Sequence, residues 1–517
     1  MSTDQGLLLA LLIVPAIGAL FAAGMPARLD RAAKIGGTAF AAATFGIVFA
    51  FLPGGPPPSS TSEFPTFRAI KANPIAPWAE IDLPWAPDLS LRFHLGIDGV
   101  SYPLVALTAG LTMLCCAYCL WRVPDPGRGR LLVALLLVLE VGIIGVFLAL
   151  DLVLFFVFFE LVLLPMYAVI AVWGGPDRRR AARKFVLYTL FGSVLLLVGV
   201  FTVVSAAGTG DLVALSDPQS STPMRGGVQL LAFVLFAAAF AVKSPLWPLH
   251  TWLPAAHTEA PTVGSVVLAG VLLKMGTYGL IRVAVGVAPE AAARSAPVLG
   301  ILATAAIIVG GLVCLAQTEL KRLIAYSSVG HMGFVLLGVA TLTATGFQAA
   351  LIGNIAHGIV TGLLFFVAGG IKDRAHTGDL AQLGGLRETA PALSGILAFA
   401  AIASLGLPGL AGFWGEAFAV VAAFERGGPL WTTLGVLAAV GAALAAAYFL
   451  RLLRRVTHGA ASPPVAVLGA TAGRLRPGEL VAWSPLIALT LAVGVAPVGV
   501  LAFSRAAAEA LAGVVSP

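Results

Sequence analysis

The chain has 517 residues, of which 59% are hydrophobic and 11% are charged, and its formal net charge is +7. A water-soluble domain carries charge on roughly a quarter of its residues, so this composition excludes a soluble globular protein. At about 20 residues per crossing, the chain can form a dozen or more membrane-spanning helices. All four cysteines lie in apolar segments, which argues against a disulfide framework and favours simple packing for the CxxC pair Cys116 and Cys119.

Apolar runs of spanning length predict fourteen transmembrane helices. The first run follows five residues that lack the basic start of a signal peptide, so we expect it to be a retained helix. The predicted spans are 6–24, 32–52, 98–121, 131–149, 152–173, 184–207, 228–257, 262–283, 296–317, 321–342, 346–371, 391–424, 429–451 and 482–503. The two sizeable stretches outside these spans, 53–97 and 456–481, are each too short to fold alone into a catalytic domain.

The 31 Lys and Arg residues predict how the spans are oriented. Loops that follow odd-numbered spans hold 21 of them, and two lie within spans. The opposite side holds eight: Arg68, Lys71, Arg92, Arg225, Arg282, Arg294, Arg426 and Arg505. By the positive-inside rule, the side with 21 is cytoplasmic and both termini lie outside. Topology therefore explains the positive charge, and nucleic-acid binding is not expected.

Ionisable side chains recur at one depth in the predicted spans. Five of them lie within about two residues of a span midpoint: Glu160, Lys243, Lys274, His331 and His357. An ionisable group in the membrane is costly and marks a functional site by default. Both buried cations are lysines, although Arg outnumbers Lys 24 to 7 in the chain. Because a buried lysine can release its proton whereas arginine stays protonated, this choice favours proton transfer.

Two more carboxylates lie within spans, and two histidines lie near span ends. Glu140 has no supporting context, so a helix-packing role and a supporting place in a proton path both stay open. Glu416 directly follows a Gly/Pro-rich interruption. His257 and His376 are expected to be loop residues, because they fall where spans end.

The spans 228–257 and 391–424 are too long, and too rich in Pro and Gly, to be uninterrupted helices. Three prolines follow Lys243 in the first, and the sequence GLPG precedes Glu416 in the second. Irregular backbone at membrane depth lines cavities, and paired interruptions in two halves indicate an inverted-repeat transporter. We predict an all-α fold with two inverted five-helix repeats, formed by spans 4–8 and 9–13, in which spans 7 and 12 are broken. The expected parts are 1–130 with the first three spans and an outward loop, 131–283 and 296–451 with the repeats, and 452–517 with a cytoplasmic loop and the last span.

Six stretches resemble a known family. They are FFVFFELVLLPMYAVIAVWGG (155–175), AVKSPLWPLHTWLPAAHTEAPT (241–262), GVLLKMGTYGLIR (270–282), ELKRLIAYSSVGHMGFVLLG (319–338), NIAHGIVTGLLFF (354–366) and LGLPGLAGFWGEAF (405–418). In these residues the chain resembles the antiporter-like subunits of respiratory complex I, above all their M type (chain 4 in mitochondria). Glu416 favours the M type, because sister subunits and Mrp-type antiporter chains usually carry Lys there.

The resemblance implies roles for the buried groups. Glu160 would pair with Lys243 and modulate its pKa, and Lys274 would be the linking site. His331 and His357 would continue the polar axis, and Glu416 would end the outward half of the path. His250 resembles the family's histidine beside the broken part of span 7.

The same resemblance implies a setting. We expect a bacterial cell membrane, with the lipid bilayer and the other membrane-arm subunits of complex I, including the sister antiporter-like subunits, as partners. No cofactor or metal is expected in this chain, which lacks a phosphate-binding loop, a dinucleotide fingerprint and a cysteine set for an iron–sulfur cluster. Flavin, iron–sulfur clusters and quinone are expected in partner subunits.

We interpret the chain as a proton-translocating subunit of NADH:quinone oxidoreductase that is driven by quinone reduction elsewhere in the complex. Two alternatives stay open. An Mrp-type cation/proton antiporter chain would share the fold and most motifs, although Glu416 argues against it. A non-transporting scaffold would not need the line of titratable groups. Relatives in hydrogenase and formate-oxidising complexes would keep this chemistry with another electron donor.

Overall fold

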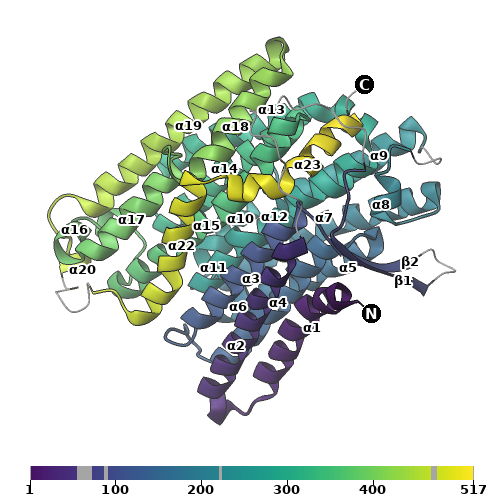
Figure 1. Cartoon of the computed structure of the whole chain (residues 1–517). Helices are drawn as coiled ribbons and strands as arrows, with labels where there is room; N and C mark the ends of the chain where they lie inside the picture. The colour runs from purple at the N-terminus through teal and green to yellow at the C-terminus, as the bar shows by residue number, and fades with distance from the viewer. Residues whose placement is uncertain are drawn as a thin grey trace.

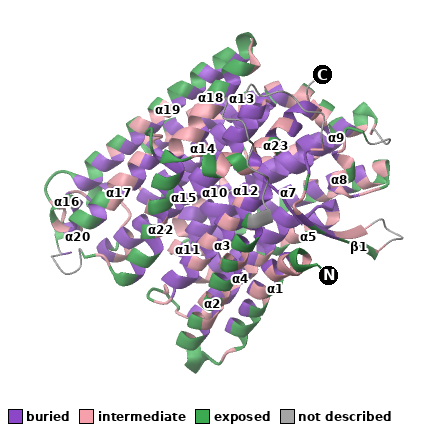
Figure 2. Ribbon diagram, viewed as in Figure 1, coloured by how far each residue is buried: buried purple, intermediate pink, exposed green. Residues whose placement is uncertain are grey.

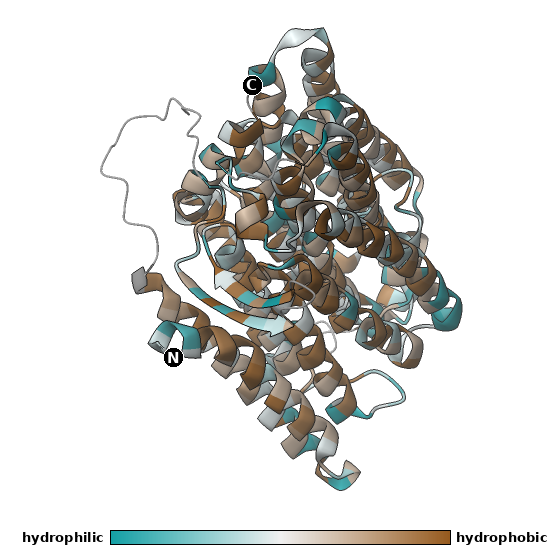
Figure 3. Ribbon diagram, turned by 90° about the vertical axis from the view of Figure 1, so that its right-hand side faces the viewer, coloured by the Kyte–Doolittle hydropathy of each residue, from teal (hydrophilic) through white to brown (hydrophobic). Residues whose placement is uncertain are grey.

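The computed structural model describes residues 2–54, 73–86, 91–219, 224–466, 468 and 474–515. Helices form one bundle in which the first and last helices lie on the outside (Figure 1). Apolar residues predominate along the helices, and the strongly polar residues gather toward helix ends (Figure 3). This is the distribution that a lipid environment requires, because only helices with internally satisfied backbone groups can cross a bilayer. The prediction of a helical membrane protein is confirmed.

The first half of the chain forms the helices that precede the first broken span, together with two strands. In order they are α1 (Thr3–Gly24), η1 (Ala27–Leu29), α2 (Asp30–Val48), η2 (Phe49–Gly54), β1 (Ala79–Ala86), β2 (Leu91–Ile97), α3 (Ser101–Tyr118), α4 (Gly129–Leu148), α5 (Leu152–Leu161), α6 (Leu163–Trp173), α7 (Arg178–Ala207) and α8 (Leu212–Leu215). The α5–α6 boundary has a local cause. Pro165 has no backbone N–H to donate to the Leu161 carbonyl, so the helix is interrupted at Val162.

The second half begins with the first broken span and ends with two helices at an angle to each other. In order its elements are α9 (Gly226–Lys243), α10 (Trp252–Glu259), α11 (Thr262–Val267), η4 (Leu268–Leu272), α12 (Leu273–Gly279), η5 (Leu280–Val285), α13 (Pro289–Ala316), α14 (Leu320–Thr341), α15 (Ala344–Ala375), η6 (Leu380–Gln382), α16 (Leu386–Thr389), α17 (Pro391–Ser404), α18 (Ala411–Arg426), α19 (Gly428–Thr457), α20 (Pro463–Ala466), α22 (Pro477–Val495) and α23 (Val498–Val515). Both predicted breaks are present, between α9 and α10 and between α17 and α18.

Fourteen helices among the described residues are long and apolar enough to cross a membrane, as predicted. Their identity differs from the prediction at the C-terminus, where the expected span 482–503 is divided by Pro497 into α22 and α23. On α23, Phe503 packs on Tyr102 near the start of α3, and Ser504 hydrogen-bonds to Gln348 near the start of α15. The helices α3 and α15 are the third and eleventh crossings, and odd-numbered crossings all start at the same end of the bundle. Because α23 contacts the starts of both, it lies along that end. The broken pair α17–α18 supplies the remaining crossing.

Two equivalent links occur, one within each of the two sets of spans that the sequence assigns to the repeats. The motif Thr-Gly-Asp-Leu occurs at 209–212, before α8, and again at 377–380, before η6. In each copy the Asp pairs through a backbone bridge with the residue before a crossing, Asp151 in the first and Glu319 in the second. Those crossings are the fifth and the tenth, and they start at opposite ends of the bundle. This correspondence supports two inverted repeats.

An antiparallel hairpin, β1–β2, lies at the end opposite the basic loops, where a helical fold alone was predicted. Charged side chains of the hairpin form hydrogen bonds within it and to Asp211 of the bundle. His94 is buried, and its Nδ1 lies 2.9 Å from Asp211 Oδ2 while its Nε2 lies 3.4 Å from Glu80 Oε2. Arg92 binds Asp82 through two hydrogen bonds of 2.7 and 2.5 Å.

The hairpin contact should weaken as pH rises. Burial lowers the pKa of His94, but the hydrogen bond to Asp211 and the charges of the nearby carboxylates outweigh burial and raise it above its ordinary value. A raised pKa stabilises the folded state fully below the unfolded pKa of about 6.5, and that contribution is lost as pH rises through the folded pKa. Amide exchange of residues 91–97, corrected for the intrinsic rate, should therefore accelerate with pH. In His94→Gln this dependence should disappear, and an unchanged dependence there would contradict the assignment.

Thiol labelling tests the orientation, since the native cysteines are all buried. Arg180 and Gln219 are exposed at the two ends of α7 and of the segment after it. An impermeant thiol reagent should label Arg180→Cys in inverted vesicles and not in intact cells, because the basic loops are predicted to be cytoplasmic. Gln219→Cys should behave in the reverse way. The opposite pattern for this pair would overturn the predicted orientation.

Candidate functional site

The predicted mid-membrane groups lie on helices in the interior of the bundle. The apolar cores of Thr262–Val285 and Ala344–Ala375 are fully enclosed by other parts of the protein. They carry Lys274 and His357, and Figure 2 shows that this central region is almost continuously buried. These two residues are therefore shielded from lipid by the surrounding helices.

Lys243 is the last residue of α9 and lies directly before the break. Its side chain is 2% exposed, and its Nζ lies 4.7 Å from the centroid of the Phe159 ring. Glu160, the next residue on α5, is half-buried and close enough for its charge to act on Lys243. No nitrogen–oxygen contact within 4.0 Å joins the two in the described structure, so the pairing that the resemblance implied is electrostatic and not a direct ion pair.

The backbone beyond Lys243 is held without regular helix. Pro245 and Pro248 lack amide hydrogens, which prevents α9 from continuing. Trp252, at the start of α10, donates its indole N–H to the Val242 carbonyl at 2.9 Å and so closes the break.

Lys274 lies where a crossing changes its helical geometry. The short helix α12 is flanked by the π-helical turns η4 and η5, for which the sequence carries no signal. The Lys274 Nζ reaches the Ala269 carbonyl at 2.5 Å, five residues back, and lies 2.6 Å from His357 Nδ1 on α15. A π-turn is frequent at functional sites. Here it leaves a carbonyl available to accept a hydrogen bond from the fully buried Lys274 amine.

The two lysines lie on chain segments in direct contact. A Cβ on Gly276, two residues after Lys274, would lie 2.3 Å from the Ser244 hydroxyl and 2.8 Å from its backbone nitrogen. Ser244 directly follows Lys243. Glycine at 276 is therefore required for α12 to approach the end of α9, and this approach brings the Lys243 and Lys274 regions together.

The second broken span brings Glu416 to His331. Glu416 Oε1 accepts a hydrogen bond from His331 Nδ1 at 2.8 Å, and His331 Nε2 lies 3.1 Å from the Ser404 hydroxyl at the end of α17. Gly406 lies in the break with a φ of +81°, and a Cβ there would lie 2.9 Å from Glu416 Oε2. Glycine thus satisfies both the turn and the close approach of the carboxylate.

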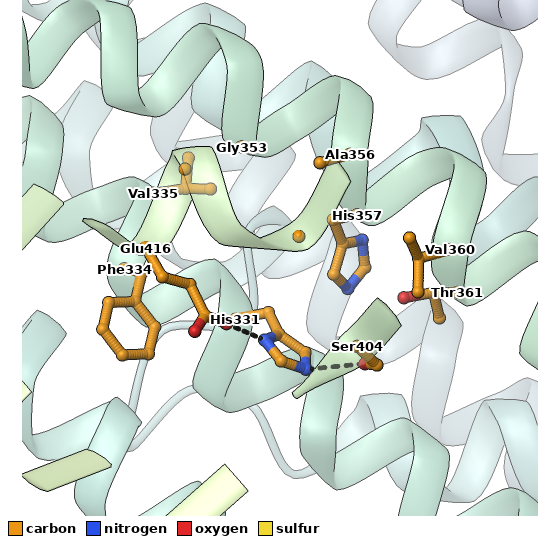
Figure 4. A pocket seen from close by; sticks show the side chains of 12 residues that line it. His331, Phe334, Val335, Gly353, Ala356, His357, Val360, Thr361, Ser404 and Glu416 are labelled. Carbon is orange, nitrogen blue, oxygen red and sulfur yellow. Dashed lines mark hydrogen bonds and ion pairs between the residues drawn. The ribbon is translucent and has the colours of Figure 1, made fainter. Parts of the chain in front are cut away.

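A small cavity lies between the two histidines (Figure 4). Figure 4 shows the His331 ring between Glu416 and Ser404, with the His357 ring beside it. The ring centroids are 6.0 Å apart, and the cavity of about 30 Å³ is lined by both rings, Ser404 and Glu416. A water needs about 10–15 Å³, so one or two waters fit between the rings. The His357 Nε2, which has no protein partner among the described residues, is available to such a water.

The remaining predicted residues lie apart from this line. Glu140 on α4 is fully buried, and neither of its carboxylate oxygens has a hydrogen-bond partner in the described part of the chain. His250 lies in the α9–α10 break, 6.1 Å from the Tyr326 ring, with its Nδ1 similarly unpartnered. Their places in the path stay predictions.

The expectation for His257 is wrong, whereas His376 does lie at a helix end. His257 is fully buried within α10, stacked on Phe365 at 4.4 Å, and both ring nitrogens lack partners among the described residues. Its ring lies close enough to Lys274 and Lys321 to feel their charges. The prediction treated 228–257 as one helix and so placed His257 at its end. The break between α9 and α10 instead leaves α10 in the interior of the bundle.

Arg282, expected in an outward loop, also lies inside. It is 1% exposed in η5 and forms a buried ion pair with Asp98 before α3, and it donates to the Pro74 carbonyl. Arg68 and Lys71, which were also expected on the outward side, lie outside the described residues. Ser404 was not predicted as a site residue, because a serine at a helix end has no distinguishing sequence signal.

A group of possible metal ligands lies outside the membrane layer. In the part of the chain that the structure describes, Asp82, His94 and Asp211 bring one ligand atom each within 4.8 Å of one another. Arg92 already binds Asp82, and His94 already binds Asp211. The group therefore fits a charge-paired contact between hairpin and bundle better than a metal centre.

A family model and the similar proteins all point to membrane subunits of NADH:quinone oxidoreductases. The family described as "NADH:quinone oxidoreductase/Mrp antiporter, TM" matches residues 149–441. The chain is 43% identical over 435 residues to NADH-quinone oxidoreductase subunit M of Rhodobacter capsulatus, covering 82% of each chain. It is 42% identical to an NAD(P)H-quinone oxidoreductase chain 4 of Synechococcus sp. (strain JA-3-3Ab), covering 80% of this chain and 78% of that one.

Solved structures share the fold over the whole chain. A chain of respiratory complex I from Thermus thermophilus superposes with a TM-score of 0.83 and 29% identity, covering 99% of this chain and all of that one. A chain of the Mrp complex from Dietzia sp. DQ12-45-1b has a TM-score of 0.80 at 23% identity, covering 99% of this chain and 52% of that one, and so shares the fold. The chain belongs to the NADH:quinone oxidoreductase/Mrp antiporter membrane family, and within it to the subunit M, or chain 4, type.

Proposed function

We propose that this chain moves protons across the membrane as a membrane-arm subunit of an NADH:quinone oxidoreductase. The observation that carries the proposal is the connected line from Lys274 through His357 and His331 to Glu416. Two of its links are direct contacts of 2.6 and 2.8 Å, and a water-sized cavity spans the third. Each member can bind and release a proton, which a structural polar network does not need.

Proton movement along the line follows from the donors and acceptors present. A charged Lys274 donates to His357 Nδ1, and the proton on His357 Nε2 then faces the cavity. A neutral imidazole accepts at one nitrogen and donates at the other, so each ring passes a proton without moving far. From the cavity, the His331–Glu416 pair takes up the proton, and Ser404 fixes the ring.

The charge on Lys243 regulates proton release from Lys274. Two ammonium groups on contacting segments repel each other in a medium of low dielectric constant. When Lys243 holds a proton, repulsion therefore favours release from Lys274 toward His357. Glu160 opposes this repulsion, because its charge attracts the Lys243 ammonium. A conformational signal that changes the Glu160–Lys243 separation would thus load or empty the line.

The setting of the proposal is a complex. Quinone reduction, flavin and iron–sulfur chemistry are assigned to partner subunits, and this chain contributes no cofactor. The proposed partners are the other membrane-arm subunits, including sister antiporter-like chains, in a bacterial cell membrane with both termini outward. Identity of 43% to a chain named subunit M, against 23% to the Mrp chain, favours this reading over a cation/proton antiporter. A scaffold would not require the buried proton-binding line.

Removing the Lys243 amine should reduce proton transfer along the line. Lys243→Ala should assemble and lower quinone-linked proton pumping by about tenfold or more, because losing a proton-transfer group costs about 10²–10⁴ in rate. Lys243→Arg should rescue poorly, since guanidinium keeps its proton. Pumping is measured in inverted vesicles, with Lys184→Ala as a control for a lysine away from the line. Near-normal pumping by assembled Lys243→Ala would refute the role.

Glu416 should act by titration and not by shape. Glu416→Gln preserves the contact with His331 but cannot ionise, so pumping should fall by about the factor expected for a lost acid–base group, while assembly survives. Glu416→Asp should retain much of the activity. Glu425→Gln, on the same helix and exposed, is the matched control. If the Gln and Asp variants of Glu416 behave alike, the structural role is favoured instead.

A further inference from the structure

An apolar groove on the outer surface of the bundle is independent of the proton line. It lies between α1 and α6 and is floored by α4, against which both helices pack. Its volume is about 630 Å³, and its lining is almost entirely aliphatic, from Ala16, Leu20, Leu135 and Val138 among others. Figure 1 shows these helices on the lower part of the bundle, away from α19. The groove is therefore open to the membrane.

The groove covers the depth of one lipid leaflet. Along α4 it extends from Leu131 to Val141, which is about 15 Å at 1.5 Å per residue. The hydrocarbon core of a bilayer is about 30 Å thick, so one leaflet is about 15 Å. The deep end lies at Val141 and Leu161, which directly follow Glu140 and Glu160 in the sequence. The other end lies at the helix termini that carry the basic loops.

A positive charge without a partner lies at that shallow end. Arg128 lines the groove and is exposed, and its guanidinium forms no hydrogen bond or ion pair in the described structure. Its position is fixed on both sides. Trp173 donates its indole N–H to the Gly127 carbonyl at 2.6 Å, and Arg130 donates to the Ala23 carbonyl at the end of α1, also at 2.6 Å. Tryptophan at the membrane interface marks the level of the headgroups.

We propose that this groove binds one anionic phospholipid. An acyl chain fills the leaflet-deep apolar channel over α4, and the phosphate meets Arg128 at its mouth. The charge complementarity distinguishes this occupant from an apolar helix of another subunit, which would leave the Arg128 guanidinium unpaired. Basic side chains at the membrane surface attract anionic headgroups in this way.

Photocrosslinking tests the site in the full chain with its partners, extracted from the membrane into phosphatidylcholine nanodiscs. The probe is a phosphatidylglycerol with a diazirine near the end of one acyl chain, and crosslinked peptides are identified by mass spectrometry. We expect crosslinks to α1 and α4. Arg128→Gln should lower their yield about fivefold, equivalent to the about 1 kcal/mol that one basic side chain contributes near an anionic surface. Ala16→Phe should block them by filling the groove.

Matched controls decide between occupants. Arg454→Gln removes an exposed basic residue near the end of α19, on the far flank, and should leave the yield unchanged. A phosphatidylcholine probe with the same chain should crosslink less at α1 and α4. Equal crosslinking by both probes, or an unchanged yield in Arg128→Gln, would overturn the proposal. Crosslinks from a photoreactive residue at position 16 to another subunit, in place of lipid, would do the same.

Discussion

The contact between Lys274 and His357 is the constraint on which the polar interior depends. A fully buried ammonium group is costly in a bilayer unless other groups replace its water. Here a π-turn supplies the Ala269 carbonyl and α15 supplies the imidazole. Both helices are enclosed by the rest of the bundle, so these polar atoms never face lipid. The peripheral helices thus make possible a proton-binding layer that no single span could hold.

Backbone irregularity coincides with three of the predicted site residues. Lys243 ends a helix, Lys274 lies between two π-turns, and Glu416 follows a break with two glycines in the left-handed region. A regular helix satisfies its own backbone groups and offers none to a side chain. An interrupted helix exposes carbonyls and makes room for water, but only where other helices shield it from lipid. The breaks are therefore a means of making polar sites inside an apolar bundle.

Much of this could be predicted from sequence, because the signals are local. Prolines after Lys243 and the GLPG sequence before Glu416 remove backbone hydrogen bonds wherever they occur, and both breaks are present. That the titratable groups share one depth in the membrane stays a prediction from span length. The π-turns could not be predicted, since Leu268–Leu272 has no residue that marks them. His257 was misplaced for a tertiary reason, because depth along a broken helix cannot be counted from its end.

The two Thr-Gly-Asp-Leu links suggest how the halves are kept in register. Each link ties the start of one crossing to the segment that precedes a broken span, through backbone hydrogen bonds of 2.8 Å in both directions. One link lies at each end of the bundle, so each half is fixed at one end and carries one broken span. The halves nevertheless differ in chemistry, with Lys243 at one break and Glu416 at the other. A lysine is positive when ionised and a glutamate is negative. The same electric field therefore stabilises the ionised form of one and destabilises that of the other. Symmetry of the backbone thus places one broken span in each half, and the asymmetry of these two side chains would give the proposed proton movement between them a direction.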